Sequence, residues 1–348
     1  MVTQKDVANL AGVSFITVSR VINGEHNVKD ETRRKVLAAI DKLGYAPSFA
    51  GQVLNSGKCN TIGVLSPIPF YKAIRSFYLM DILAGINDVC LKNGVDLLMN
   101  IVPEVGKVPN YDYLRAYKQK KVDGIIYIGL KKLPEEMLAE LKIRKLPCVV
   151  IGDRPDSELI SWVDTDNIQA AKNSVNEIWK RGHRRIAFVG LKKSIYNANV
   201  NDREKGFVDE LLRLGADYNP KDYIIRTDFD SKDLYLDVEN ALKSFDVKPT
   251  AIFCCTDSCV PGTVKGIQNT GLSVPDDISL VGFDGFINDT YYDMNVATNP
   301  QPVQQMGQRA AEILFNHIKN PGAQKETAVM SVPFAPGDSL KDISAGEN

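Results

Sequence analysis

The stretch that most constrains the fold of this chain is residues 2–23, VTQKDVANLAGVSFITVSRVIN. Two short segments with apolar residues at helical spacing flank a break at Gly12. Ser14 can cap the second helix, because its hydroxyl can accept from an unpaired backbone N–H of the first turn. Two helices joined at a wide angle by a glycine turn form a helix-turn-helix, whose second helix suits the major groove of DNA. A helical hairpin inside an ordinary domain is the alternative.

A third amphipathic helix is predicted over residues 30–43, with acidic residues at its start and Gly44 at its end. The three helices make a headpiece of about 45 residues, which is near the lower size limit for a self-contained core. The whole chain has 348 residues, so we expect further domains after the headpiece.

The charge is distributed unevenly. Residues 1–58 hold eight Lys/Arg against five Asp/Glu, and the remainder holds 34 against 38. A mildly basic headpiece on an acidic body fits phosphate contact at one end only. No apolar run is long enough to cross a membrane, and the polar start does not resemble a signal peptide. We therefore expect a cytoplasmic protein with no membrane partner.

Three of the six cysteines, Cys254, Cys255 and Cys259, cluster near the end of an apolar run. No histidine is close in sequence and the spacing is not that of a zinc site, so we expect buried, reduced thiols. A metal site at this cluster is the alternative. The sequence predicts no metal and no cofactor.

From residue 61 onward, apolar runs alternate with amphipathic segments, which predicts parallel strands with helical crossovers. Strands are predicted at 62–65, 96–99, 124–128, 148–151, 185–189, 223–225, 251–254 and 279–283. Helices are predicted at 82–92, 111–120, 135–143, 169–181, 203–214, 234–245, 261–270 and 303–319. The pattern alone fits one large sheet or a barrel equally well.

The amino-acid sequence of the headpiece is more specific than its helical pattern. DVANLAGVS, TVSRVIN and the later TRRKVLAAIDKLGYAPS resemble the headpiece of the lac repressor (LacI/GalR) family of transcriptional regulators. The resemblance implies an α/β protein with a lambda-repressor-like helix-turn-helix headpiece and a periplasmic-binding-protein type I fold, which has two doubly wound parallel-sheet lobes. The implied domains are a headpiece (1–46), a hinge helix or linker (47–60) and an effector-binding domain (61–340). Lobe 1 would span about 61–160 and 293–321, and lobe 2 about 161–292 and 322–340.

The resemblance also implies how DNA is bound. Arg20 suits a bidentate contact with guanine, whereas Phe15 and Ile16 can only pack on apolar base edges. In the family a leucine of the hinge helix wedges into the minor groove, and Leu54 matches it. Gly51 and Gln52 depart from the common Ala-Arg pair, which leaves a plain interdomain linker as the alternative. The expected DNA-binding residues are Ser14, Phe15, Ile16, Thr17, Ser19, Arg20, Asn23, Gln52 and Leu54.

A small-molecule effector is expected between the lobes, at the carboxyl ends of the strands. The family pattern matches GDR at 152–154, DREKGF at 202–207, CTD at 255–257, GFD at 282–284 and QPVQQMG at 301–307. An arginine beside carboxylates suits vicinal hydroxyls, and an aromatic ring suits the apolar face of a sugar. The expected effector-binding residues are Tyr78, Asp153, Trp162, Arg203, Thr256, Asp284 and Gln301.

Each of these residues has a plainer alternative. Asp284 and Asp257 could cap the helices that follow their strands, Arg203 could form a surface ion pair, and Trp162 could belong to a core. Tyr78 comes from the segment 66–81, which is longer and more aromatic than is usual in the family. Ligand choice therefore cannot be copied from a relative.

These features predict a repressor, not an enzyme, that binds palindromic operator DNA as a homodimer and responds to a small effector, carbohydrate in class. The effector could instead act as a corepressor, or the protein as an activator. A solute-binding protein without DNA function is the remoter alternative. One apolar face of the helix at 82–92 is a candidate dimer surface, unless it packs on its own sheet.

Overall fold

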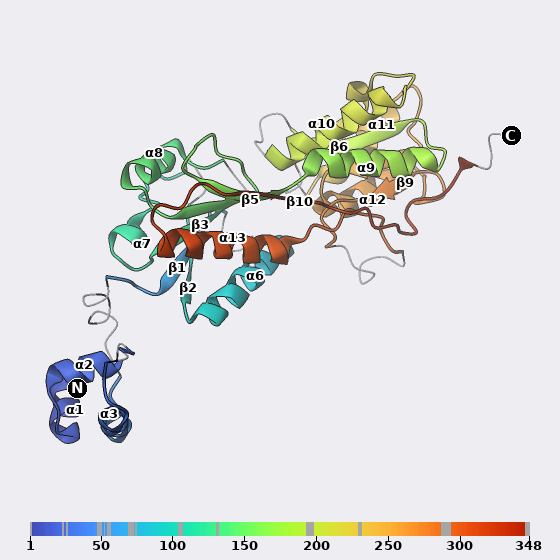
Figure 1. The fold of residues 1–348 in the computed structure, drawn as a ribbon. Coiled ribbons are helices and arrows are strands. Elements are labelled where there is room, and N and C mark those ends of the chain that lie inside the picture. Colours follow the sequence, from blue (N-terminus) through green and yellow to red (C-terminus); the bar gives the residue numbers. More distant parts are fainter. Residues whose placement is uncertain are drawn as a thin grey trace.

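The computed structural model describes residues 2–22, 24–25, 27–46, 51, 53, 57–68, 73, 75–103, 107–129, 132–192, 198–228, 232–286 and 294–344. Three short helices come first and two α/β lobes follow (Figure 1). This arrangement confirms the predicted fold class. No helix among the described residues is both long enough and apolar enough to span a membrane.

The headpiece consists of α1 (Gln4–Ala11), α2 (Phe15–Ile22) and α3 (Asp30–Leu43). Thr3 starts α1 through a capping box, in which its backbone N–H donates to the Asp6 carboxylate at 2.8 Å. Gly12 ends α1 with φ +66°, a left-handed conformation that glycine adopts without strain. The three helices share a small core that includes Val7, Val18, Val21 and Val36.

Lobe 1 is built on a six-stranded sheet of order β10-β5-β4-β3-β1-β2, and all of its strand pairs are parallel. Its strands are β1 (Thr61–Ser66), β2 (Asp96–Ile101), β3 (Gly124–Ile128), β4 (Cys148–Ile151), β5 (Ser161–Thr165) and β10 (Thr327–Met330). Its helices are α6 (Phe77–Asn93), α7 (Arg115–Lys118), α8 (Glu135–Arg144) and α13 (Val303–Lys319).

Lobe 2 is built on a four-stranded parallel sheet of order β7-β6-β8-β9. Its strands are β6 (Ile186–Leu191), β7 (Ile224–Thr227), β8 (Ala251–Cys254) and β9 (Ser279–Val281). Its helices are α9 (Asn167–Lys180), α10 (Ala198–Arg213), α11 (Leu234–Ser244), α12 (Val260–Asn269) and two 3-10 turns, η1 (Pro220–Tyr223) and η2 (Asp257–Cys259).

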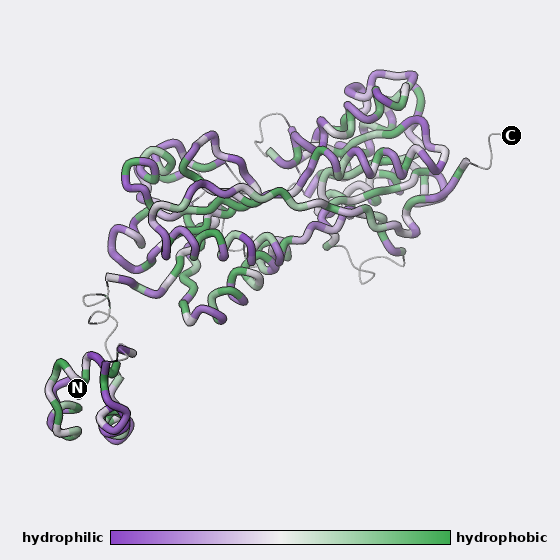
Figure 2. The backbone as a smooth tube through the Cα atoms, in the orientation of Figure 1, coloured by the Kyte–Doolittle hydropathy of each residue, from purple (hydrophilic) through white to green (hydrophobic). Residues whose placement is uncertain are grey.

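Both sheets are covered on both faces, which explains why their strands are runs of apolar residues (Figure 2). In lobe 1, α6 and α13 bury one face of the sheet, while the other face packs on residues of α7 and α8. In lobe 2, α9 packs on α10 and α11 packs on α12. Cys254, Cys255 and Cys259 are fully buried in the lobe 2 core, as predicted.

Helices α6 and α13 cross at glycines. A Cβ added to Gly85 would lie 1.9 Å from the Gln304 carbonyl oxygen, and one added to Gly307 would lie 2.2 Å from the Ile82 carbonyl oxygen. The buried side of α6, with Ile82 and Ile86, faces this contact and the sheet. The apolar face that was a candidate dimer surface is therefore part of the lobe 1 core.

The structure moves three predicted lobe boundaries. Residues 161–165 and 327–330, which were assigned to lobe 2, form β5 and β10 of the lobe 1 sheet. They pair with each other, so they cross between the lobes side by side (Figure 1). The segment 297–300 forms bridges with residues of lobe 2, although it was assigned to lobe 1. The helix predicted at 111–120 is shorter and spans only Arg115–Lys118.

Candidate nucleic-acid interface and interlobe ligand site

The second headpiece helix separates an inward face from an outward one. Val18 and Val21 are buried, whereas Phe15 and Ile16 are 49% and 61% exposed. Two large apolar side chains left open on a small basic headpiece indicate a surface that another molecule covers. Arg20 lies on the same helix, half exposed, with its Nε 3.7 Å from a carboxylate oxygen of Glu25.

The predicted cap of α2 is present. The Ser14 hydroxyl accepts from the Thr17 backbone N–H at 3.1 Å and lies 2.8 Å from the Thr17 hydroxyl. Thr17 and Ser19 are partly buried at the sides of the helix. Three predicted DNA-binding residues, Asn23, Gln52 and Leu54, lie outside the described residues, so the hinge-helix hypothesis stays a prediction.

The polar centre of the ligand domain is Arg203 in α10. Its side chain is only 5% exposed. Nε donates to the Asn167 side chain at 2.8 Å, and one terminal nitrogen donates to the Cys255 carbonyl at 2.7 Å and to Asp284 at 3.2 Å. The guanidinium carbon lies 3.7 Å from the centroid of the Phe283 ring. Arg203 is therefore a buried side chain held by three acceptors, not a surface ion pair.

Asp284 follows β9, and its carboxylate accepts hydrogen bonds from side chains of three elements. Besides Arg203, it accepts from the Gln301 side-chain amide at 2.7 Å and from the Thr256 hydroxyl. Its backbone has φ +120°, a conformation that residues other than glycine seldom adopt. Such strain persists only where the surroundings hold it, and it concentrates at functional sites. In the described part of the chain, the hydrogen bonds to the Asp284 carboxylate come from side chains.

Gln301 lies where the chain crosses from lobe 2 back to lobe 1. Its carbonyl oxygen accepts from the Thr165 hydroxyl at 3.0 Å at the carboxyl end of β5, while its amide donates to Asp284. Asn167, at the start of α9, donates to the Thr165 carbonyl at 3.1 Å and accepts from Arg203. One hydrogen-bond network therefore runs from a lobe 1 strand to the lobe 2 site.

Asp257 supports this site from behind. One carboxylate oxygen accepts from the backbone N–H groups of Gly285 and Phe286, at 2.8 Å each, and the other accepts from the Thr298 hydroxyl at 3.0 Å. Burial, together with the nearby charge of Asp284, raises the pKa of Asp257 to about 6. Its carboxylate holds the turn after β9 and does not cap its own helix.

Tyr78 approaches the same place from lobe 1. Its ring meets Phe286 of lobe 2 edge-on, with centroids 6.4 Å apart. Its hydroxyl lies against Gly152 at the end of β4, 3.1 Å from where a Cβ would stand. Burial raises the pKa of the Tyr78 hydroxyl, and the charges of Asp164 and Asp284 raise it further. Tyr78 thus lies close to both lobes at their facing strand ends.

Two predicted effector residues are placed elsewhere. Asp153 is buried and accepts from the backbone N–H groups of Leu133 and Arg154, at 3.3 and 3.0 Å, so its carboxylate holds a loop of lobe 1. Trp162 lies near the start of β5, beside Val150, and packs against a lobe 1 core cluster. Parallel-sheet proteins bind ligands at the carboxyl ends of their strands. Trp162 lies at the opposite end of β5, so we assign it to the core.

The structure adds residues that sequence reasoning missed. Arg154 lies 3.0 Å from Asp164 of β5 and also pairs with Asp202 of α10, so it joins the two lobes. Burial raises the pKa of Asp164 to about 6. Arg154 adjoins the matched Asp153, but nothing in the sequence marks a carboxylate inside strand β5.

Unsatisfied polar atoms also gather near this site. Among the described residues, Ser66 Oγ and Asn199 Oδ1 are buried without a hydrogen-bond partner, and Asp164 Oδ2 meets only the Arg154 Nε, at 3.0 Å. Ser66 and Asp164 lie at or near the carboxyl ends of β1 and β5, and Asn199 opens α10 close to Gly152. Buried polar groups are normally bonded, so these atoms indicate room for hydrogen bonds to a ligand. No group of described residues has the composition of a metal site.

A helix-turn-helix headpiece, joined to two lobes with a polar site at their facing strand ends, defines a ligand-responsive DNA-binding regulator. Residues 3–48 match the model of bacterial regulatory proteins of the lacI family, and residues 175–340 match the periplasmic binding protein-like domain. The chain belongs to the lacI family of transcriptional regulators.

Relatives agree with this assignment along nearly the whole chain. The HTH-type transcriptional repressor PurR of Aliivibrio salmonicida is 33% identical, with 92% of this chain and 93% of that protein covered. Catabolite control protein A of Priestia megaterium is 32% identical, with 96% of each chain covered. The structure of the lac repressor dimer bound to operator and the anti-inducer ONPF has the same fold, with a TM-score of 0.83, 23% identity and coverage of 98% of this chain and 99% of that chain.

Proposed function

We propose that this regulator is a repressor that works in the cytoplasm as a homodimer on palindromic operator DNA, and that a carbohydrate-like effector bound between its lobes sets its DNA affinity. The observation that carries the proposal is the buried network of Arg203, Asp284, Gln301 and Thr256, which lies where the lobes meet. Its donors and acceptors come from four separate elements, as recognition of a polyhydroxyl molecule requires.

Tyr78, Asp164 and Asn199 complete the proposed site. The Tyr78 ring offers an apolar surface beside the polar network, as the flat face of a pyranose needs. The unpaired Asn199 Oδ1, and the Asp164 carboxylate beside Arg154, supply acceptor positions for ligand hydroxyls. We leave Trp162 out of the proposed site because it packs against a lobe 1 core cluster. We leave Asp153 out because its carboxylate accepts from the Leu133 and Arg154 backbone N–H groups.

Names of relatives support this class of ligand. A neighbour with the same fold is named as the transcriptional regulator CelR in complex with cellobiose, and another as a LacI family regulator of Enterococcus faecium with bound ribose. The repressor PurR and catabolite control protein A relatives are regulators, and we propose no catalytic role for this chain.

In this proposal, the outward face of α2 contacts the base edges and phosphates of the DNA. Arg20 contacts a guanine, Phe15 and Ile16 pack on apolar base edges, and Ser14, Thr17 and Ser19 contact phosphates. Because one headpiece buries too little surface for tight binding, two are needed on a two-fold symmetric site. Hinge contacts by Gln52 and Leu54, and a phosphate contact by Asn23, remain part of the proposal.

A gel shift tests the proposal. The full chain is mixed with DNA from upstream of its own gene, with and without a panel of mono- and disaccharides. We expect a specific shift whose midpoint moves with one sugar, because an effector that prefers one lobe arrangement must change operator affinity. A weaker shift identifies an inducer and a stronger one a corepressor. Calorimetric sugar binding without any DNA shift would favour a solute-binding protein instead.

A further inference from the structure

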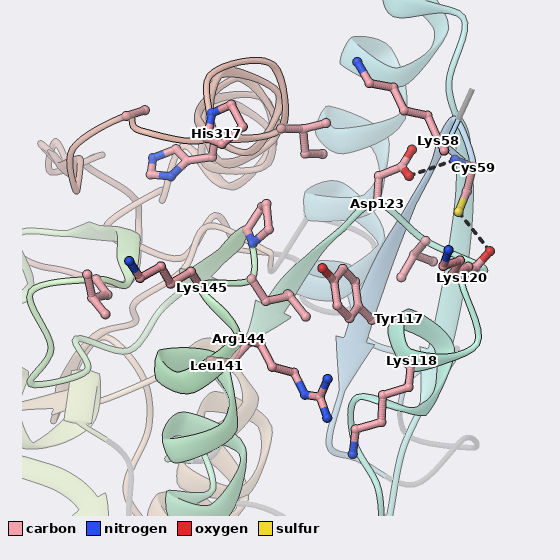
Figure 3. A pocket seen from close by; sticks show the side chains of 18 of the residues that line it. Lys58, Cys59, Tyr117, Lys118, Lys120, Asp123, Leu141, Arg144, Lys145 and His317 are labelled. Atoms are coloured by element: carbon pink, nitrogen blue, oxygen red, sulfur yellow. Dashed lines mark hydrogen bonds between the residues drawn. The ribbon is translucent and has the colours of Figure 1, made fainter. Parts of the chain in front are cut away.

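Lobe 1 carries a second hollow, at the end of its sheet opposite the interlobe site. It is an open basin of about 740 Å³, within the size range of small-molecule sites. Its lining starts with Gly57, Lys58 and Cys59, the residues through which the chain enters β1 after the headpiece. The remaining lining comes from α7, α8, α13 and the turns beside them (Figure 3).

The charged side chains that line the basin are almost all basic. They are Lys58, Lys118, Lys120, Arg144 and Lys145, against the single carboxylate of Asp123. Figure 3 shows Lys145 on the same side as His317, and Lys58, Lys118 and Lys120 on the other side. Convergence of cations from separate elements costs repulsion, which an anion between them would remove.

Two of these cations are already held in place. Lys118 pairs with Asp112 at 2.9 Å and with Glu140 at 2.8 Å, and Arg144 pairs with the same Glu140 oxygen at 3.0 Å. Glu140 therefore fixes both basic side chains at the rim and offsets part of their charge.

Lys120 and Lys145, unlike Lys118 and Arg144, are not held by ion pairs to any of the described residues. Both are exposed, and neither forms an ion pair with another residue in the described part of the chain. Lys145 is the C-cap of α8, and Lys120 lies two residues after the end of α7; both have a left-handed conformation, with φ +49° and +52°. The backbone therefore sets the direction in which each side chain leaves the turn. In the described part of the chain, both ammonium groups therefore have their N–H donors available for a ligand.

The floor of the basin and the start of β1 are linked. The Cys59 backbone N–H donates to Asp123 at 2.8 Å, and the Cys59 thiol donates to the Lys120 carbonyl at 2.9 Å. The one carboxylate of the lining is thereby engaged with the backbone of Cys59. Tyr117 adds an aromatic surface, and Val122, Leu141 and Leu146 supply a buried apolar floor.

We propose that this basin binds a phosphate-bearing small molecule, held by Lys120 and Lys145 and flanked by Lys118 and Arg144. Several ammonium groups and a guanidinium around one hollow suit a multiply charged anion better than a single carboxylate. The site is separate from the proposed interlobe site, and its lining includes the residues that lead from the DNA-binding headpiece into lobe 1.

Calorimetric titration of the full chain with inorganic pyrophosphate, at constant ionic strength, tests the proposal. The informative variant is K120Q/K145Q. The matched control is K121Q/K142Q, which makes the same charge change at neighbouring exposed lysines outside the lining. Since all four side chains are exposed, both variants should fold like the wild type, as the thermal midpoint checks. We expect the pyrophosphate Kd to rise at least tenfold in K120Q/K145Q and less than twofold in the control.

Three results would overturn the proposal: no binding to the wild type, equal weakening in both variants, or unchanged binding in K120Q/K145Q. The third result distinguishes another source of phosphate. If the two lysines served the DNA backbone instead, K120Q/K145Q would bind pyrophosphate normally, while the salt dependence of its operator binding would become shallower.

Discussion

Arg203 of α10 and Asp284, the third residue after β9, form a salt bridge of 3.2 Å that is almost closed to solvent. The pair sits at the carboxyl ends of the lobe 2 strands, where Gln301 connects it to lobe 1. An ion pair in such a place is costly to desolvate, so it is a better sign of ligand recognition than of stability.

Replacing Asp284 by asparagine should weaken effector binding and stability together. Arg203 and Gln301 donate to one carboxylate oxygen and Thr256 donates to the other, so the amide removes the negative charge opposite Arg203 and turns the acceptor that faces Thr256 into a donor. We expect at least a tenfold loss of affinity for the sugar that shifts wild-type operator binding, and a drop of about 1–3 kcal/mol in the free energy of unfolding. Calorimetry and urea unfolding measure the two effects.

Asp276 provides the matched control for that substitution. Its side chain is 72% exposed and pairs with Lys341 at the surface. Asp276→Asn should leave affinity unchanged and alter stability by less than about 0.5 kcal/mol. Wild-type affinity in Asp284→Asn would remove Asp284 from the ligand site.

We expect the ionisation of Asp164 to lower the free energy of unfolding as the pH rises. Burial raises its pKa to about 6, above the value of about 3.9 in the unfolded chain. Between these values the folded state binds more protons than the unfolded state, so this group costs free energy as it ionises. We expect a loss of about 2 kcal/mol from pH 4 to pH 7 that is absent in Asp164→Asn. Urea unfolding of both proteins across this range measures it, and parallel pH profiles would contradict it.

The fold could be predicted largely because its strands are continuous apolar runs buried on both faces. The two strands that were missed lack that signature. β5 contains the buried Asp164, and β10 alternates between exposed and partly buried residues at the sheet edge. Since lobe boundaries follow strand pairing, missing these strands misplaced the boundaries too.

The site was predictable where a residue lies in a family motif. Arg203, Thr256, Asp284 and Gln301 converge in one network as their motifs suggested. Asp153 occupies a matched position too, yet its carboxylate is taken up by backbone N–H groups, and hydrogen-bond partners cannot be deduced from position. The contact of Arg154 with Asp202 depends on how the two lobes face each other, which no local pattern encodes.

Arg154 and Asp202 should show coupling across the lobes. They belong to different lobes, and Arg154 is 38% exposed, so solvent screens part of the interaction. A double-mutant cycle with Arg154→Gln and Asp202→Asn should give a coupling of about 0.5–1 kcal/mol in the free energy of unfolding. The cycle with Asp164→Asn should give more, since that carboxylate is buried. Strictly additive effects in the cycle with Asp202 would mean that Arg154 does not join the lobes, because Asp164 belongs to the same lobe as Arg154.

Gly307 should tolerate no side chain. A Cβ there would lie 2.2 Å from the Ile82 carbonyl oxygen, so α13 and α6 would have to separate. We expect Gly307→Ala to lower the free energy of unfolding by about 1–3 kcal/mol. Gly322→Ala is the control, because a Cβ there meets no atom within 4 Å. Equal unfolding midpoints for the two variants in urea would show that the helices do not cross this closely.

Arg20 should determine one base pair of the operator. Its side chain is half exposed on the outward face of α2, and Glu25 lies close enough to orient it. Arg20→Ala should lose about 1–3 kcal/mol of discrimination at one position, because a bidentate contact with guanine disappears. Binding to every single-base variant of the operator measures this loss. Lys42→Ala, at the exposed end of α3, is the control and should keep the wild-type profile. If Arg20→Ala keeps that profile as well, Arg20 contacts only the DNA backbone, and Phe15 and Ile16 become the remaining sources of base preference in the described part of α2.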